Sequence, residues 1–150
     1  MERIASFTVD HTRLEPGIYV SRVDGDITTY DLRTRKPNFG DYMDNSTMHT
    51  FEHMFATFVR NSEIAKDVIY FGPMGCQTGF YLLVRNADND KVLSTVKDVL
   101  EKINEYSGEV FGCSEIECGN YRSLNLECAK REARRLSEIL NSRVQTFIYD

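Results

Sequence analysis

The chain alternates between short runs of β-branched and aromatic residues and longer stretches in which apolar residues recur every three or four positions. The short runs predict strands at residues 17–23, 27–33, 67–72 and 78–84. The helical spacing predicts helices over residues 46–61, over residues 90–106, and from Ser123 to about Leu140. Asn45, Ser46 or Thr47 is expected to cap the first helix and Ser123 the last, because their side chains accept hydrogen bonds from backbone amides.

These elements predict an α+β fold, a mainly antiparallel sheet packed against helices. The turn Asp24-Gly25-Asp26 joins the first two strands into a hairpin. No repeat, low-complexity tract or Pro/Ser-rich linker divides the chain, and 150 residues with 41% apolar and 27% charged content suit one globular core. We therefore expect a single domain over residues 1–150.

Charge and targeting signals narrow the class of function. A formal net charge of −5 gives no broad basic surface, which argues against binding to nucleic acid or anionic membranes and favours a small polar substrate. The N-terminus has no apolar signal region, and no window approaches the ~20 apolar residues of a membrane span. We therefore expect a soluble, cytoplasmic protein. Its four cysteines form no C-x-x-C pair, and without a secretion signal they are expected to be reduced thiols.

Two of the three histidines stand four residues apart in the first predicted helix, with a glutamate between them. At ~100° per residue, His49 and His53 lie ~40° apart and Glu52 is about one position round, so the three side chains can converge. This H-x-x-E-H order lets two neutral imidazoles bind a divalent cation while the carboxylate is left free as a proton acceptor. The alternative is a solvated polar stripe opposite the apolar face of the helix.

A catalytic metal ion needs a third protein ligand. The candidates are a downstream carboxylate or a cysteine. Cys118 stands out because "ECGNY" follows an irregular segment and precedes a helix, where loop backbone can direct a thiolate inward, although Cys113 and Cys128 compete. Taken alone, a small cysteine is more often simply buried.

A second cysteine environment lies in "GPMGCQTGF", between the last two predicted strands. Cys76 stands in a tight turn with glycines at positions 72, 75 and 79, so the backbone can approach a ligand and the thiol is unshielded. A functional thiol here needs a lowered pKa, which a nearby metal cation can provide. The alternative is a turn in which the cysteine is incidental.

Five segments, in order along the chain, resemble the S-ribosylhomocysteine lyase (LuxS) family. They are "SFTVDHT" (6–12), "DLRTRKPN" (31–38), "HTFEH" (49–53), "GPMGCQTGFY" (72–81) and "ECGNY" (117–121). The similarity runs from residue 4 to about residue 140 and covers nearly the whole chain. One such motif is a weak signal, whereas five in the family's order are specific.

The resemblance implies a ligand set and an acid–base pair. His49, His53 and Cys118 match the family's ligands for one divalent metal ion per chain, with Fe2+ as the native ion and Zn2+ or Co2+ able to replace it. The fourth position is left for water or substrate. Glu52 and Cys76 match the catalytic general acid–base pair.

The resemblance also implies a substrate pocket and an assembly. Ser6, His11 and Arg33 match positions that contact substrate or shape its pocket, and the family forms homodimers with two active sites at the subunit interface. The chain departs from the family six positions before the loop cysteine, where many relatives carry an acidic residue and this chain has Tyr70. What that acid contributes is therefore open here, and Asp67 is not an obvious substitute.

The implied activity is that of a carbon–sulfur lyase. It cleaves the thioether of S-ribosyl-L-homocysteine to L-homocysteine, which re-enters the methyl cycle, and 4,5-dihydroxypentane-2,3-dione, the autoinducer precursor of bacterial quorum sensing. The thioether breaks by β-elimination once a carbonyl sits at carbon 3 of the ribose, so the carbonyl must migrate there from carbon 1. Each step moves a proton beside a carbonyl, which suits two acid–base side chains, and a metal with two neutral imidazoles and one thiolate keeps a positive charge as Lewis acid.

Two other classes of protein share parts of this pattern. An inverted-motif (H-x-x-E-H) zinc metallopeptidase would use Glu52 to activate water and take a glutamate as third ligand, so that Cys118 and Cys76 would be dispensable. A non-catalytic structural metal-binding module would have four protein ligands, with Cys113 or Cys76 as the fourth. Neither class accounts for the glycine-flanked loop cysteine.

Overall fold

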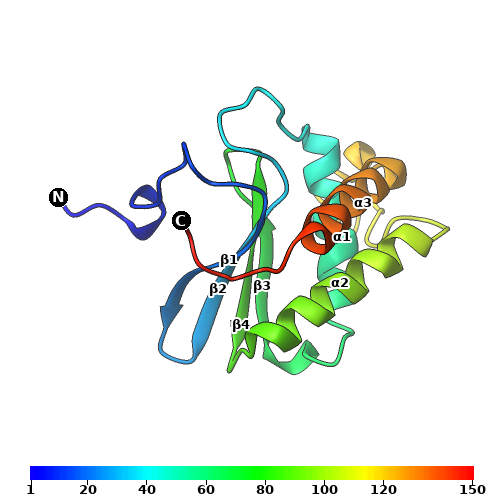
Figure 1. The fold of residues 1–150 in the computed structure, drawn as a ribbon. Coiled ribbons are helices and arrows are strands. Elements are labelled where there is room, and N and C mark those ends of the chain that lie inside the picture. The colour runs from blue at the N-terminus through cyan, green and yellow to red at the C-terminus, as the bar shows by residue number, and fades with distance from the viewer.

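The computed structural model describes residues 1–150 as one α+β domain, in which three α-helices cover one face of a four-stranded antiparallel sheet (Figure 1). The strands are β1 (Gly17–Asp24), β2 (Ile27–Arg33), β3 (Val68–Pro73) and β4 (Gly79–Arg85). The helices are α1 (Asn45–Val59), α2 (Asn89–Glu105) and α3 (Leu126–Ser142), with short 3-10 helices η1 (Ala5–Phe7), η2 (Ala65–Asp67) and η3 (Tyr121–Ser123). None of the helices combines the length and the apolar character needed to cross a membrane. The predicted fold class and each predicted strand and helix are confirmed, with small shifts at their ends.

The two faces of the sheet have different partners, because successive side chains of a strand point to opposite sides. The strand order is β1-β2-β4-β3. Tyr30 and Leu82, opposite each other in β2 and β4, are fully buried in the core beneath the helices. Asp31 and Tyr81, the next pair, project from the other face, which the N-terminal segment borders. Polar residues of β2 and β4 therefore lie on the face away from the helices.

Four phenylalanines hold α1 against the sheet. Phe51 and Phe55 come from successive turns of α1, and Phe71 and Phe80 come from β3 and β4. The ring centroids of Phe55 and Phe71 are 4.3 Å apart, and those of Phe51 and Phe80 are 4.7 Å apart. Stacked and tilted aromatic pairs of this kind add about 0.5–1.5 kcal/mol beyond the burial of their area. This packing fixes the rotation of α1, and with it the direction of the histidine pair.

The cap of α1 differs from the prediction. Asp44 is the capping residue, in place of Asn45, Ser46 or Thr47, and its carboxylate accepts a hydrogen bond from the Thr47 amide at 2.8 Å. Asp44 has an extended backbone, with φ −77° and ψ 169°, which is the conformation that lets a side chain reach back to the first turn. The hydrogen bonds from Thr47 lower the pKa of Asp44, so its carboxylate is favoured as a negative charge at the helix N-terminus.

The start of α3 also differs from the prediction. The helix begins at Leu126, and the Asn125 side chain accepts from the amides of Glu127 and Cys128. Ser123 ends η3 instead of capping α3, because its hydroxyl is used in hydrogen bonds elsewhere. The difference matters for the candidate site, where this hydroxyl reappears.

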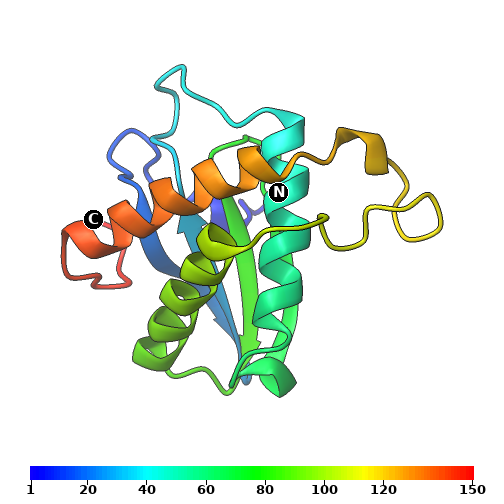
Figure 2. The ribbon, with the colours of Figure 1, turned by 90° about the vertical axis from the view of Figure 1, so that its right-hand side faces the viewer.

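Two irregular segments complete the fold. Residues 106–125, between α2 and α3, extend outward beside α1 (Figure 2). The C-terminal residues return along β1, where the Val20 amide donates to the Phe147 carbonyl at 2.8 Å and Tyr19 and Phe147 form a parallel bridge. The sequence patterns predicted neither arrangement.

Candidate active site

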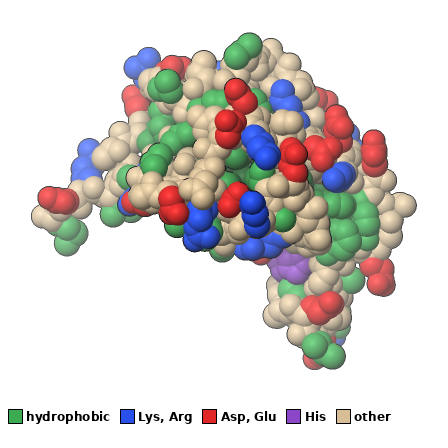
Figure 3. All heavy atoms as spheres, turned by 90° about the horizontal axis from the view of Figure 1, so that it is seen from below, with side chains coloured by type: hydrophobic (Ala, Val, Ile, Leu, Met, Phe, Trp, Pro, Cys, Tyr) green, Lys and Arg blue, Asp and Glu red, His purple; other side chains and the backbone are tan.

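Three side chains converge on the side of α1 next to the 106–125 segment. His49 and His53 occupy successive turns of α1, and their ring centroids are 4.7 Å apart. Cys118 comes from the turn before η3, and its Sγ lies 3.3 Å from His49 Nε2. The ligand atoms of the three residues all lie within 4.8 Å of one another, and we call this set the metal group. Figure 3 shows histidine side chains reaching the surface between the body of the molecule and a projecting lobe.

One nitrogen of each histidine ring is fixed by a hydrogen bond. His53 Nδ1 lies 2.7 Å from the Phe111 carbonyl oxygen, which can only accept, so Nδ1 carries the proton. His49 Nδ1 lies 2.6 Å from Ser123 Oγ, and because that hydroxyl donates to the Asn120 carbonyl, it accepts from His49. In the neutral form of each ring, the proton is therefore on Nδ1 and the lone pair is on Nε2, which is the tautomer that binds a metal ion through Nε2.

Cys118 is the cysteine that completes the metal group. Its Sγ accepts a hydrogen bond from the Asn120 amide at 3.4 Å, which helps to orient the sulfur. Cys113, which is half-buried, and Cys128, which is buried on α3, lie outside the group, and no carboxylate joins it. Two neutral imidazoles and one thiolate suit a divalent zinc or iron ion and leave one position of a tetrahedral centre open. The residues present fit a catalytic metal site.

Burial shifts the titration of two groups on α1. Burial, with a smaller contribution from His53, lowers the pKa of His49, which keeps the ring neutral over a wider range of pH. Burial raises the pKa of Glu52, and His53 offsets part of that rise. Glu52 is not among the converging ligand atoms, so its carboxyl group is left free to exchange protons.

Cys76 lies at a separate place, in the loop between β3 and β4. Its thiol is exposed, and its Sγ lies 3.1 Å from Thr78 Oγ1 and 3.7 Å from Arg33 Nη1. The loop turns tightly, because Gln77 adopts a left-handed backbone with φ 66°. Cys76 does not belong to the metal group, so the structure brings together the three predicted ligands and leaves the loop thiol outside them.

Arg33 is buried, with 3% of its surface exposed, although it ends a strand. Its Nη2 donates to Asp31 Oδ2 at 2.6 Å and its Nη1 donates to Thr78 Oγ1 at 2.7 Å. Burial lowers the pKa of Arg33, but the charge and hydrogen bond of Asp31 outweigh this and raise it overall, so the guanidinium stays charged. Gly79 lets the backbones of β2 and β4 come this close together beside Arg33, since a Cβ at position 79 would lie 2.7 Å from the Leu32 carbonyl oxygen. A fixed cation thus stands beside the Cys76 thiol.

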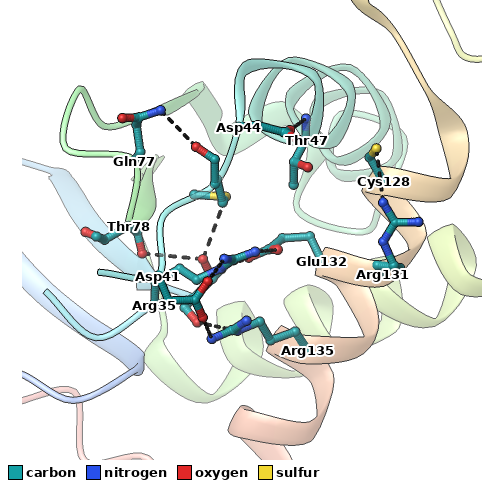
Figure 4. A network of polar contacts seen from close by, with 12 residues as sticks. Arg35, Asp41, Asp44, Thr47, Gln77, Thr78, Cys128, Arg131, Glu132 and Arg135 are labelled. Carbon is teal, nitrogen blue, oxygen red and sulfur yellow. Dashed lines mark hydrogen bonds and ion pairs between the residues drawn. The ribbon is translucent and has the colours of Figure 1, made fainter. Parts of the chain in front are cut away.

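The cysteine loop is tied to the rest of the fold, as Figure 4 shows. Gln77 Nε2 donates to the Met43 carbonyl at 2.8 Å, just before the cap of α1. The Thr78 carbonyl accepts from the amide of Arg35 at 3.0 Å, and the Arg35 side chain forms a 2.6 Å ion pair with Glu132 of α3. Because Glu132 is 2% exposed, this ion pair is largely shielded from solvent, and it connects the loop region to the helices.

Ser6 and His11 lie on the N-terminal segment, and neither makes a hydrogen bond to Arg33 or to the metal group. Ser6 lines a cavity of about 550 Å³ on the sheet face away from the helices, together with Tyr70. His11 is partly buried, and its Nδ1 donates to the carbonyl of Val9 at 2.9 Å. Tyr70 is 52% exposed on β3. The structure therefore places Ser6 at a cavity on the sheet face away from the helices, while His11 does not line that cavity.

Two residues of the site were missed by the sequence reasoning. Ser123 was assigned to a helix cap, and its contact with His49 depends on the path of an irregular segment that no pattern predicts. Asp31 was passed over, although a signal existed. A charged residue two positions before Arg33 in a strand lies on the same face as that arginine, which favours an ion pair.

Comparisons with known proteins agree with this geometry. The model of the family S-ribosylhomocysteinase (LuxS) matches residues 4–146. The chain is 43% identical over 148 residues to the S-ribosylhomocysteine lyase of Borreliella afzelii, covering 95% of this chain and 94% of that protein. It is 44% identical over 149 residues to the proteins of the same name from Desulfotalea psychrophila and Clostridium acetobutylicum, with the same coverage.

Proposed function

The chain belongs to the S-ribosylhomocysteinase (LuxS) family, and on this premise we propose that it is a metal-dependent S-ribosylhomocysteine lyase, a carbon–sulfur lyase. The observation that carries the proposal is the convergence of His49, His53 and Cys118, a three-ligand site whose histidine tautomers are already set for metal binding. The substrate is S-ribosylhomocysteine, and the products are homocysteine and 4,5-dihydroxypentane-2,3-dione.

The reaction divides into two carbonyl migrations and one elimination. Each migration removes a proton from the carbon beside a carbonyl and returns a proton to the neighbouring carbon. With the carbonyl at carbon 3, loss of the carbon 4 proton expels the homocysteine sulfur from carbon 5. When bound, the divalent ion supplies the Lewis acid that polarises the substrate oxygens.

Glu52 and Cys76 carry the protons. The raised pKa of Glu52 brings its carboxyl group closer to neutrality, where a side chain exchanges protons most effectively. Cys76 presents an exposed sulfur 3.7 Å from the charged Arg33 guanidinium, where it can take up and release a proton. The side chains thus offer two acid–base groups of different chemical type for successive proton transfers.

The native ion is ferrous iron, with zinc or cobalt able to replace it. The donor set supports this choice, because imidazole and thiolate ligands suit all three metals. The four cysteines are unpaired, which fits a reducing compartment where ferrous iron is also preserved, and we place the enzyme in the cytoplasm on that ground.

The chain forms a homodimer whose two active sites lie at the interface. The outer face of the sheet supports this arrangement, because Ile4 and Tyr70 line its cavity, are 58% and 52% exposed, and would be covered by a second copy. Ser6 and His11 stand on the segment beside this face, where they are available to contact substrate or shape its pocket. Arg33 shapes the pocket indirectly, because its guanidinium donates a hydrogen bond to Thr78 at the end of the cysteine loop.

The two alternative functions are less well supported. A zinc peptidase of the inverted-motif type takes a glutamate as third ligand, whereas Cys118 is the third member of the metal group and no glutamate joins it. A structural metal module needs a fourth protein ligand, and neither Cys113 nor Cys76 belongs to the group.

The test is an anaerobic assay of the purified protein with S-ribosylhomocysteine, in which the free thiol of homocysteine is followed and the metal content of the same sample is measured. We expect thiol release with about one divalent ion per chain, loss of release on chelation and recovery on adding Fe2+. Metal binding without thiol release, after reloading with Fe2+, Zn2+ and Co2+ in turn, would overturn the proposal.

A further inference from the structure

The last residues of the chain reach the ion pair that holds Arg33. They lie beyond residue 146, where the family match ends. Tyr149 donates its hydroxyl to Asp31 Oδ2 at 2.7 Å, and its ring stacks on Tyr19 with centroids 4.8 Å apart and planes inclined by 17°. Phe147 adopts a left-handed backbone with φ 65°, a costly conformation for an aromatic residue that its contacts with β1 hold in place. The chain end is therefore packed onto the sheet at a specific register.

The Asp31 carboxylate depends on few donors. It is 1% exposed, and both of its hydrogen bonds, from Arg33 and from Tyr149, meet the same oxygen, Oδ2. Its other oxygen, Oδ1, has no partner, and neither has Arg33 Nε. A buried ion pair is stable only when further hydrogen bonds satisfy its partners, so the Tyr149 hydroxyl is a large part of what holds this carboxylate.

The Tyr149 hydroxyl is a dependable donor. Burial and the neighbouring Asp31 raise the pKa of Tyr149, so the group stays protonated throughout the range in which enzymes work. On the far side of the pair, the Arg33 guanidinium uses its second nitrogen to contact Thr78 and Cys76, at 2.7 Å and 3.7 Å. A continuous series of contacts thus runs from the chain end to the loop thiol.

We propose that Tyr149 is a positioning residue for Cys76: its hydroxyl holds the Asp31 carboxylate, which in turn fixes the Arg33 guanidinium beside the thiol. Removing the hydroxyl has two consequences of the same sign. The Asp31 charge is left less compensated, which disfavours a thiolate nearby, and the guanidinium loses its fixed orientation. The role in catalysis rests on the proposed function, but the effect on the chemistry of the thiol does not.

The first arm of the test measures the thiol directly. Tyr149→Phe keeps the stacked ring and removes only the hydroxyl, and Tyr19→Phe is the matched control, because the hydroxyl of Tyr19 donates to the Glu15 carbonyl instead. The alkylation of Cys76 by iodoacetamide is followed against pH by mass spectrometry of its peptide. We expect Tyr149→Phe to slow this alkylation about threefold to tenfold at neutral pH and to shift its profile to higher pH, with the control unchanged.

The second arm measures turnover of S-ribosylhomocysteine. We expect Tyr149→Phe to lower kcat by a similar factor, with KM within about twofold and metal content unchanged. An unchanged alkylation profile in Tyr149→Phe would overturn the proposal, and so would an equal slowing in Tyr19→Phe, which would indicate a general loosening of the chain end. If the wild type fails to cleave S-ribosylhomocysteine, the proposed function fails, while the alkylation comparison still decides the role of Tyr149.

Discussion

The metal group and the thiol loop are built in opposite ways. The metal group is half-buried, and each of its histidine rings is oriented by a single hydrogen bond that it donates to a neighbouring segment, His49 to the Ser123 hydroxyl and His53 to the Phe111 carbonyl. The thiol of Cys76 is exposed, but the group that faces it belongs to a fully buried ion pair. The metal group thus has free ligand atoms on side chains that are held by few hydrogen bonds. The thiol loop has an exposed sulfur next to a side chain that is held in a buried ion pair.

The difference fits the roles that we propose for the two halves. A metal ion orders its own ligands when it binds, so free lone pairs and an open position matter more than prior rigidity. A thiol that exchanges protons has no such partner, so its charge environment must be fixed in advance. The two halves share no hydrogen-bond partner, and their chemistry should be separable by experiment.

The largest effect is expected from removing a metal ligand. His53→Ala should abolish both metal binding and thiol release, because two remaining ligands do not hold a catalytic ion. The alkylation rate of Cys76 should stay at the wild-type value, since the loop does not depend on the metal group. Metal analysis, the lyase assay and peptide mass spectrometry on one preparation check all three. A variant that binds metal as tightly as wild type would show that the ligands are misassigned.

The opposite result, loss of activity with the metal retained, is expected from changing the two residues that we propose to transfer protons. Cys76→Ala and Glu52→Gln should each keep about one metal ion per chain and lose about 10²- to 10⁴-fold in kcat. Cys113→Ala is the control, because that cysteine lies outside both groups and should leave metal content and kcat unchanged. If either catalytic variant turns over at close to the wild-type rate, its acid–base role is wrong.

Ser123→Ala sharpens the contrast between lightly and rigidly held groups. Without the hydroxyl, the tautomer and orientation of His49 are no longer fixed, and metal affinity should fall about 10- to 100-fold. Ser142→Ala, at the far end of α3, is the matched control and should have no effect. Competition with a chromophoric chelator measures both. An unchanged affinity in Ser123→Ala would mean that the metal ion alone orients the ring.

Lowering the pH should reduce kcat by protonating Glu52, the carboxyl group that lies on the same helix as the two histidines. Burial raises the pKa of Glu52 above its ordinary 4.5, and the group must be ionised to accept a proton, so kcat should fall as pH drops through a value above 4.5. The residual activity of Glu52→Gln should lack this limb. Metal content is measured at each pH, and a limb at or below 4.5 in fully loaded enzyme would contradict the assignment.

The smallest effect is expected at the N-terminus of α1, where the chain contacts the cysteine loop. Asp44 caps α1, and the preceding Met43 carbonyl holds Gln77 of the cysteine loop. Asp44→Ala should lower the free energy of unfolding by about 1 kcal/mol at neutral pH. Because the hydrogen bonds of Thr47 lower the pKa of Asp44 below 3.8, this stability is complete above 3.8 and is lost as pH falls through the lowered value. Urea unfolding at pH 7 and at a series of pH values below 3.8 should therefore show a difference that shrinks as the pH falls.

The fold was largely predictable because its elements are written in local patterns. The hairpin of β1 and β2 follows from two β-rich runs and a turn, and α1 follows from apolar residues at helical spacing. The caps were not predictable to the residue, since several polar side chains precede each helix and backbone angles decide which one reaches the amides. Ser123 is such a case, because tertiary contact with His49 outweighed its capping preference.

Site residues that are close together in the sequence could be predicted, whereas contacts between distant segments could not. The pair of His49 and His53 follows from the helix period, but Ser123 contacts His49 across 74 positions of sequence. Tyr149 contacts Asp31 across 118 positions, and no pattern in either segment indicates the other. Side chains that hold the functional groups in place are therefore visible only in the folded chain.

The most direct test of the central claim is to alkylate Cys76 in the metal-loaded wild-type protein and to measure metal content and thiol release from S-ribosylhomocysteine before and after. We expect metal to stay at about one ion per chain while thiol release is abolished, because the two halves are separate in structure and both necessary for the reaction. Loss of the metal on alkylation, or continued release of homocysteine with Cys76 fully modified, would contradict it.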